Sequence, residues 1–272
     1  MEVISIKAKK AINFLIDSLV NKYITKAKKD GHLKNSGNPF VMALLSDFEP
    51  ILHNIHGLKT SLGSELEKIA EIIAIDRWGK DNVKRKIKRD VILPKSVYAE
   101  IDTILNRLSN AKTLSDYFAE KEKIKSVVQL SKAKNEATEA HKYEFDLEIY
   151  DKEKNKYYFL EMKGPDPNTT EVPGAKRRLL TQLAYGYAYT EAEDIDCPIA
   201  IYYNNKYPKP YKNPKMLGYF NPNGGILLHD DFWNFIGKDK KTYSELLNLF
   251  REYGKKNKKR IWDSFSGLMF TK

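Results

Sequence analysis

The 272-residue sequence has little of several features that define large classes of protein. It has one cysteine, Cys197, which excludes an internal disulfide framework and a zinc site built from several thiolates. No stretch approaches the roughly 18 uncharged apolar residues that a membrane span needs. A secretory signal and a Gly-rich phosphate-binding loop are also missing. We therefore expect a cytoplasmic protein that has no membrane partner and does not hydrolyse nucleoside triphosphates.

Acidic residues are outnumbered by basic ones. The sequence has 47 Lys and Arg against 36 Asp and Glu, which gives a net charge of +11. Much of the excess lies in two runs, at residues 80–89 and 255–260. Such an excess favours a polyanionic partner, above all nucleic acid. Either run alone is equally consistent with an ordinary solvated surface, so the overall excess carries the inference.

Apolar residues at helical spacing predict that the first part of the chain is mostly helical. The clearest case is residues 59–79, where Leu62, Leu66 and Ile69 share one face. The same criterion predicts helices over residues 8–29, 94–108 and 113–130.

The pattern changes near residue 142. Residues 143–150 alternate strictly between apolar and polar side chains, and residues 157–163 follow after a polar turn, which predicts a β-hairpin. We also predict a helix over 175–190, a buried strand over 197–204 and a closing helix within 230–254. Strands mixed with helices indicate an α/β (α+β) class with a mixed central β-sheet flanked by helices.

The predicted hairpin carries the candidate catalytic residues. Asp146 lies in its first strand, and Glu161 and Lys163 lie two residues apart in its second, so these last two share a face. Carboxylates bind Mg²⁺, and a bound metal polarises a phosphoryl oxygen and lowers the pKa of a water molecule. The lysine can orient that water or stabilise developing charge. The trio suits phosphodiester hydrolysis, although a surface strand can carry the same residues without function.

The trio resembles the Asp…Glu-x-Lys motif of the PD-(D/E)xK nuclease superfamily, with Glu161 lying 15 positions after Asp146. More narrowly, the chain resembles type II restriction endonucleases of the TdeIII-like family in three blocks, at residues 59–74, 145–180 and 227–254. Phe145 stands where the motif often has proline. The resemblance implies a restriction-endonuclease-like fold and Mg²⁺-dependent cleavage of double-stranded DNA at a short palindrome, with a GGNCC-like site as the candidate.

The resemblance also assigns roles within the motif. It implies that Asp146 and Glu161 bind Mg²⁺, that the Met162 carbonyl adds a ligand, and that Lys163 acts on the attacking water. Glu67 resembles the additional helix-borne acid that some of these nucleases direct at the metal. The alternative for Glu67 is a helix-capping box with Ser64, three residues earlier.

Candidate DNA contacts lie after the motif. Lys176, Arg177 and Arg178 open the next predicted helix and are expected to contact phosphates, unless they pair with nearby acids. The segment 204–223 mixes Tyr, Lys and Asn, which can recognise bases but also occur in ordinary exposed loops. The candidates within it are Lys209, Tyr211, Lys212 and Asn213.

The resulting prediction is a single domain over 1–272, with a mainly helical part (1–130), a PD-(D/E)xK catalytic core (131–272) and a late DNA-recognition loop (204–223). Cleavage of both strands of a palindrome favours a homodimer. A cognate DNA methyltransferase is implied as a functional partner that protects host DNA. Two alternatives remain: a structure-specific DNA nuclease, and a catalytically silent DNA- or RNA-binding module of the same fold.

Overall fold

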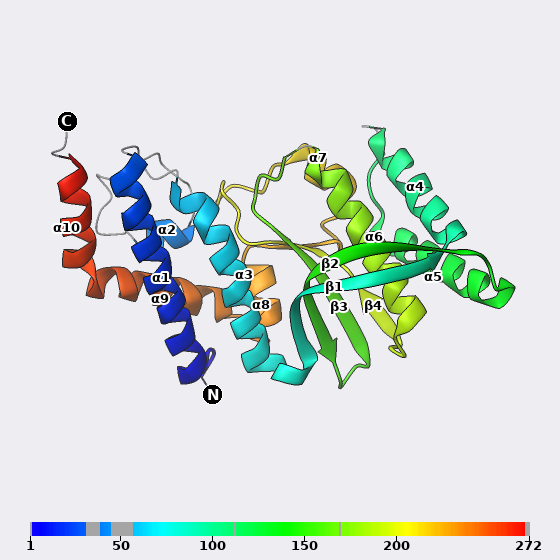
Figure 1. The fold of residues 1–272 in the computed structure, drawn as a ribbon, viewed down its shortest axis with the longest axis horizontal. Helices are drawn as coiled ribbons and strands as arrows, with labels where there is room; N and C mark the ends of the chain where they lie inside the picture. Colours follow the sequence, from blue (N-terminus) through cyan, green and yellow to red (C-terminus); the bar gives the residue numbers. More distant parts are fainter. Residues whose placement is uncertain (1, 31–38, 45–56, 111–112, 169, 270–272) are drawn as a thin grey trace. The chain divides into compact units, whose positions relative to one another are not determined.

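A computed structural model describes residues 2–30, 39–44, 57–110, 113–168 and 170–269 (Figure 1). The chain divides into two compact units. Unit 1 comprises Met1–Arg77, Tyr203–Lys209 and Asp230–Lys272, and unit 2 comprises Trp78–Tyr202 and Pro210–His229. The expectation that 1–272 forms a single domain stays a prediction.

All regular secondary structure in the described part of unit 1 is helical. Its helices are α1 (Ile6–Asp30), α2 (Pro39–Leu44), α3 (Gly57–Trp78), α8 (Asp230–Ile236), α9 (Thr242–Lys256) and α10 (Lys258–Met269). The stripe predicted on α3 is confirmed, because Leu62, Leu66 and Ile69 are all buried. Ser64 lies inside α3 rather than at its start, so the capping box with Glu67 is wrong. The helix begins seven residues before Ser64, at Gly57, where the sequence carries no such signal.

The core of unit 1 depends on a close approach between α2 and α9. Phe40 on α2 is fully buried, and its ring packs against those of Trp233 and Phe250. A Cβ atom added at Gly254 would lie 1.8 Å from the carbonyl oxygen of Leu44. Only glycine permits this backbone contact, which explains a glycine inside a helix where it is otherwise unfavourable.

Unit 2 contains a mixed sheet, as predicted. Its elements are η2 (Lys80–Asn82), β1 (Val83–Pro94), α4 (Lys95–Ser109), α5 (Tyr117–Lys134), β2 (Thr138–Asp151), β3 (Lys156–Lys163), α6 (Glu171–Tyr189), β4 (Asp194–Asp196), β5 (Ile199–Ile201), α7 (Pro214–Tyr219) and β6 (Ile226–Leu228). Among the described residues the strand order is β1-β2-β3-β5-β6, with β4 also pairing β3. The first three strands are antiparallel, whereas β3, β5 and β6 run parallel.

Strand β1 is the main element that the sequence did not predict. It spans part of the basic run at 80–89, whose charges obscure the alternation of a strand. The strand lies at the edge of the sheet, where lysines on its outer side stay in solvent while Val91 and Leu93 are buried. Lysines on an edge strand also discourage pairing with other chains.

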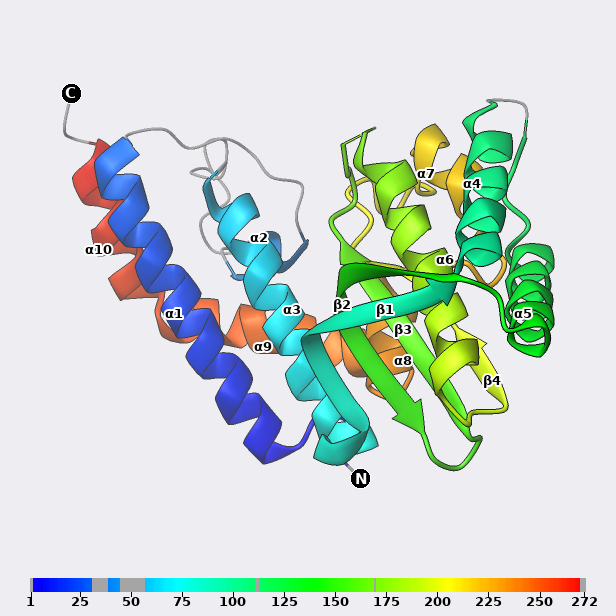
Figure 2. The same cartoon turned by 45° about the vertical axis from the view of Figure 1, so that its right-hand side comes forward.

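Helix α6 packs against β3, and α4 and α5 pack against α6 (Figure 2). Aromatic side chains form much of this contact: the Phe145 ring meets those of Phe159 and Tyr185 edge-on. The predicted hairpin and the helix that follows it are therefore held together by the core of unit 2. No helix among the described residues is long and apolar enough to cross a membrane.

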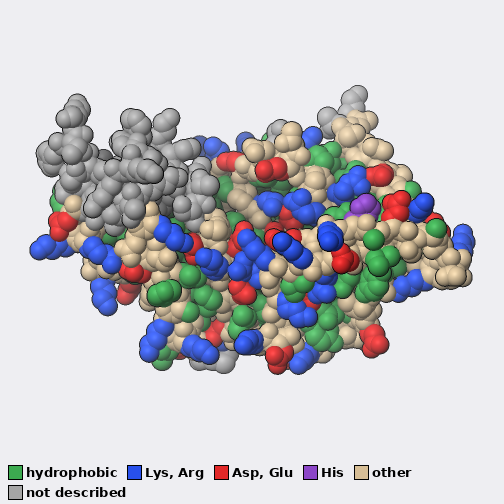
Figure 3. Space-filling model, viewed as in Figure 1, with side chains coloured by type: hydrophobic (Ala, Val, Ile, Leu, Met, Phe, Trp, Pro, Cys, Tyr) green, Lys and Arg blue, Asp and Glu red, His purple; other side chains and the backbone are tan. Residues whose placement is uncertain are grey.

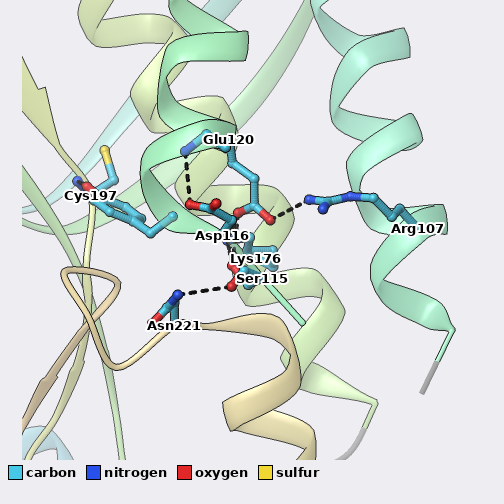
Figure 4. A network of polar contacts seen from close by, with 9 residues as sticks. Arg107, Ser115, Asp116, Glu120, Lys176, Cys197 and Asn221 are labelled. Atoms are coloured by element: carbon cyan, nitrogen blue, oxygen red, sulfur yellow. Dashed lines mark hydrogen bonds and ion pairs between the residues drawn. The ribbon is translucent and has the colours of Figure 1, made fainter. Parts of the chain in front are cut away.

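A group of charged side chains is buried between α5 and α6 (Figure 4). Glu120 accepts hydrogen bonds from Lys176 Nζ at 2.5 Å, Arg107 Nη2 at 2.8 Å and Ser115 Oγ at 3.0 Å. Burial lowers the pKa of the Lys176 amine, and the charge of Glu120 opposes that shift. A buried charge needs such partners, because leaving it unpaired carries a large free-energy penalty.

Replacing Glu120 by alanine leaves the Lys176 amine buried without its carboxylate. We expect the free energy of unfolding to fall by about 3–5 kcal/mol, measured by urea denaturation. The matched control is Lys123→Ala on the same helix, which removes an exposed ion pair with Glu100. Its loss should stay below about 1 kcal/mol. Equal losses in the two variants would contradict a structural role for the buried pair.

Candidate active site

The three motif residues meet where β2 and β3 begin to separate. The β2–β3 pairing ends at Leu147↔Leu160, whose neighbours on the two strands are Asp146 and Glu161. The Asp146 carboxylate still links the two strands here, because its Oδ2 accepts a hydrogen bond from the backbone N–H of Met162 at 2.9 Å. Strand β5 supports the other side of β3 by pairing with it from Glu161 to Lys163. The hairpin therefore holds both carboxylates at one fixed position.

Glu161 is the most buried group of the site, with 1% of its surface exposed. Its Oε1 atom accepts hydrogen bonds from Arg178 Nε at 2.9 Å and from Arg178 Nη2, and forms an ion pair with Lys163 Nζ at 2.8 Å. Its Oε2 atom is buried and has no hydrogen-bond partner among the described residues. Burial disfavours the Arg178 charge, yet the pKa of Arg178 is raised because Glu161 and Asp146 stabilise that charge.

Three acids in the middle of β2, at every second position, have different surroundings. Glu144 is exposed, Asp146 is half-buried at the site, and Glu148 is buried. Glu148 forms ion pairs with Arg89 and, at 3.6 Å, with Lys84. Part of the basic run at 80–89 therefore neutralises an acid inside the unit.

The backbone opposite Asp146 is strained. Lys86 lies opposite Asp146, between the recorded β1–β2 pairs on either side, and has a φ of 52°. For a non-glycine residue, this left-handed backbone conformation is less stable than the right-handed one by about 1–2 kcal/mol. Such conformations concentrate at functional sites.

An open cavity of about 490 Å³ lies over the motif. It is lined by Lys142, Tyr143, Glu144, Asp146, Glu161, Lys163, Gly174, Arg177 and Arg178. Sequence reasoning missed the first three of these residues. The available signal was their closeness to Asp146 along the chain, two to four residues before it.

The three cations at the start of α6 differ in burial and in ion-pair partner. Lys176 is buried against Glu120, so the prediction that it contacts phosphate is corrected: the amine faces the core and not solvent. Arg177 is partly exposed and pairs with Asp102. Arg178 is partly exposed in the cavity and pairs with Glu161. Consecutive residues in one turn of a helix point in different directions, so three adjacent cations in the sequence need not share one surface.

Two of the candidates in the segment 204–223 have structural roles. The Tyr211 ring is buried, and its hydroxyl donates a hydrogen bond to the Pro165 carbonyl at 2.7 Å. The Asn213 side chain caps α7 by accepting a hydrogen bond from the Met216 N–H at 3.1 Å. The burial of the ring corrects the expectation that Tyr211 contacts DNA, whereas a DNA contact by the half-buried Asn213 stays a prediction. Lys209 and Lys212 are exposed, which is compatible with the prediction.

Glu67 lies on α3 in unit 1, whereas the motif belongs to unit 2. Its side chain is half-buried. Its role at the metal stays a prediction.

The residues of the motif fit a divalent metal ion. The buried Oε2 atom of Glu161 lacks a partner, and Asp146 supplies a second carboxylate. In the part of the chain that the structure describes, no group of three or more His, Cys, Asp or Glu side chains could hold a metal. Two carboxylates nevertheless suit Mg²⁺, which keeps several waters and commonly takes its other ligands from substrate phosphates.

A mixed sheet whose hairpin presents two carboxylates and a lysine to an open polar cavity defines the class: a nuclease with a restriction-endonuclease-like fold. The chain belongs to the family described as "Type II restriction endonuclease, HinfI", whose sequence profile matches residues 6–254. It is thus a site-specific deoxyribonuclease by family, and such enzymes generally use a divalent metal ion. The narrower TdeIII-like assignment stays a prediction.

Two relatives are similar over most of this chain. "Type II restriction enzyme HgiCII" of Herpetosiphon aurantiacus is 25% identical over 244 residues, which cover 86% of this chain and 82% of that protein. "Type II restriction enzyme MjaII" of Methanocaldococcus jannaschii is 23% identical over 227 residues, or 79% of this chain. The match spans 58% of the MjaII protein, so that relative is considerably longer.

Arg178→Met removes the main partner of a buried carboxylate. We expect it to lower the free energy of unfolding by about 1–3 kcal/mol in metal-free buffer, because only Lys163 then remains beside Glu161. Arg177→Met is the matched control, since its neighbour Asp102 is exposed and the loss should be below about 1 kcal/mol. Chemical denaturation of both variants measures the difference. A smaller loss in Arg178→Met than in the control would show that the contact does not hold Glu161.

Proposed function

We propose that this chain is a Mg²⁺-dependent type II restriction endonuclease that cuts both strands of DNA at a short palindrome. The observation that carries the proposal is the partnerless Oε2 atom of Glu161, buried in the cavity that Asp146 and Lys163 also line. A buried carboxylate oxygen without a donor is unfavourable by itself. A metal ion at that oxygen would remove the penalty.

In the proposed mechanism, Asp146, Glu161 and the Met162 carbonyl would hold Mg²⁺. The ion would polarise the scissile phosphoryl oxygen and lower the pKa of a bound water. The Lys163 side chain lines the cavity and is one quarter exposed, and its amine, 2.8 Å from Glu161, can orient the attacking water. Arg178 can stabilise negative charge on the phosphate from the same cavity. Glu67 is proposed as a further acid directed at the metal.

The substrate determines the proposed partners. Cleavage of both strands of a palindrome needs two sites related by a two-fold axis, which a homodimer provides. Arg177, Arg178, Lys209 and Lys212 are proposed phosphate contacts. A GGNCC-like sequence is the candidate site. A cognate methyltransferase would protect host DNA, and the cytoplasm, where that DNA lies, is the expected compartment.

Digestion of unmethylated phage DNA tests this function. We expect discrete fragments with Mg²⁺ and none with EDTA. Asp146→Ala and Lys163→Ala should each lower the cleavage rate at least about 100-fold, because they remove a metal ligand and a group that acts on the transition state. Lys152→Ala is the control, since Lys152 is exposed in the turn at the opposite end of the hairpin.

Metal binding is followed separately from cleavage. Mg²⁺ should raise the melting temperature of the wild type and of Lys152→Ala, but not that of Asp146→Ala. Cleavage restricted to branched DNA would replace the proposal with a structure-specific nuclease. Sequence-independent binding without cleavage of any DNA would indicate a silent binding module.

A further inference from the structure

Strands β1 and β2 form a two-stranded ribbon that extends past the rest of the sheet. Their pairing runs from Val83↔Ile149 to Pro94↔Thr138, whereas β2 pairs with β3 only from Leu147 onward. The part of the ribbon that runs from Asp146 back to Thr138 on β2 is therefore two strands wide (Figures 1 and 2). A two-stranded ribbon fits the major groove of B-DNA, which is about 12 Å wide.

The ribbon has two faces of different character. One face includes Val91 and Leu93, which are buried in the core of unit 2. The other, here called the outer face, consists of exposed residues that lie opposite one another: Lys88↔Glu144, Asp90↔Lys142 and Ile92↔Ala140. In Figure 3, basic and acidic side chains are interspersed over the region of β1 and β2. The outer face therefore presents donors and acceptors in alternation.

The opposite charges of the outer face do not neutralise one another. Cross-strand neighbours have Cβ atoms about 5 Å apart, close enough for ion pairs. Nevertheless, among the residues that the structure describes, Lys88, Asp90, Lys142 and Glu144 form no ion pair within 4.0 Å and no side-chain hydrogen bond. Arg89 and Glu148 on the same two strands do pair. The outer face thus keeps its polar groups available for a ligand.

The outer face continues directly from the active site. Lys142, Glu144 and Asp146 all line the active-site cavity. A second cavity, of about 420 Å³, is lined by Lys88, Arg89, Asp90, Lys142, Tyr143 and Glu144, so the two cavities share three residues. At about 3.3 Å per residue, Glu144 and Lys142 lie about 7 and 13 Å along the strand from Asp146. These spacings correspond to about two and four base-pair steps of DNA.

We propose that the outer face of the β1–β2 ribbon recognises base edges in the DNA major groove beside the cleaved phosphate. Lys88 and Lys142 donate to guanine, while Asp90 and Glu144 accept from the cytosine amino group. The alternating signs favour bases over phosphates, because a carboxylate facing the DNA backbone would be repelled. This inference rests on the proposed function and locates its sequence specificity on a surface separate from the segment 204–223.

The test measures sequence preference without requiring cleavage. A pool of duplexes with a randomised centre is incubated with the protein and Ca²⁺ in place of Mg²⁺, and bound DNA is sequenced. In Glu144→Gln and Lys142→Met, we expect discrimination at one base-pair position of each half-site to fall about 10- to 100-fold, with affinity for random DNA changed far less. Glu153→Gln and Lys152→Met, in the exposed β2–β3 turn, are matched controls that should keep the wild-type preference.

Melting temperatures establish that all four variants fold. Unchanged preference in Glu144→Gln and Lys142→Met would overturn the proposal, as would an equal loss of affinity for every sequence, which indicates phosphate contacts. A wild type that selects no sequence would also overturn it. The proposed function fails differently: if the wild type selects a sequence but cuts no DNA, and the two variants lose the selection, the ribbon proposal stands while the cleavage proposal falls.

Discussion

The arrangement of the active site depends on keeping the Glu161 carboxylate buried. A buried carboxylate is stable only with compensating partners, and here both Arg178 and Lys163 contact the same oxygen. This requirement fixes α6 against β3 at Arg178, and it leaves the second oxygen of Glu161, a residue that lines the cavity, buried without a donor among the described residues. The same constraint thus stabilises the packing of unit 2 and prepares a position for a cation.

Some of the basic side chains of this chain form ion pairs with buried acids. Arg89 neutralises Glu148, and Lys176 is buried beside Glu120. These pairs use cations that composition alone would assign to a nucleic-acid surface. Because each pair is neutral, the excess of +11 remains on the rest of the molecule, but along β1 and β2 the exposed charges alternate in sign. Alternation suits recognition of base edges better than neutralisation of phosphates.

The sequence predicted the hairpin and the motif because both depend on short-range order. Strict alternation over 143–150 gave β2, and a two-residue spacing placed Glu161 and Lys163 on one face. Strand β1 was missed because a solvent-exposed edge tolerates the lysines that hide its period. Tyr211 was misassigned because an aromatic residue in a polar loop can turn inward, as its hydrogen bond to Pro165 demonstrates.

The sequence by itself determined the motif residues, the hairpin that carries them and the family, since each is encoded within a few neighbouring residues or in the chain's similarity to its relatives. Only the tertiary structure decided which charges are exposed. Three consecutive cations, Lys176, Arg177 and Arg178, meet a buried acid, an exposed acid and the motif glutamate in turn. The three side chains differ in burial because consecutive residues of a helix point in different directions. Their partners lie 17 to 75 positions away along the chain, so only the tertiary structure reveals which acid each one meets.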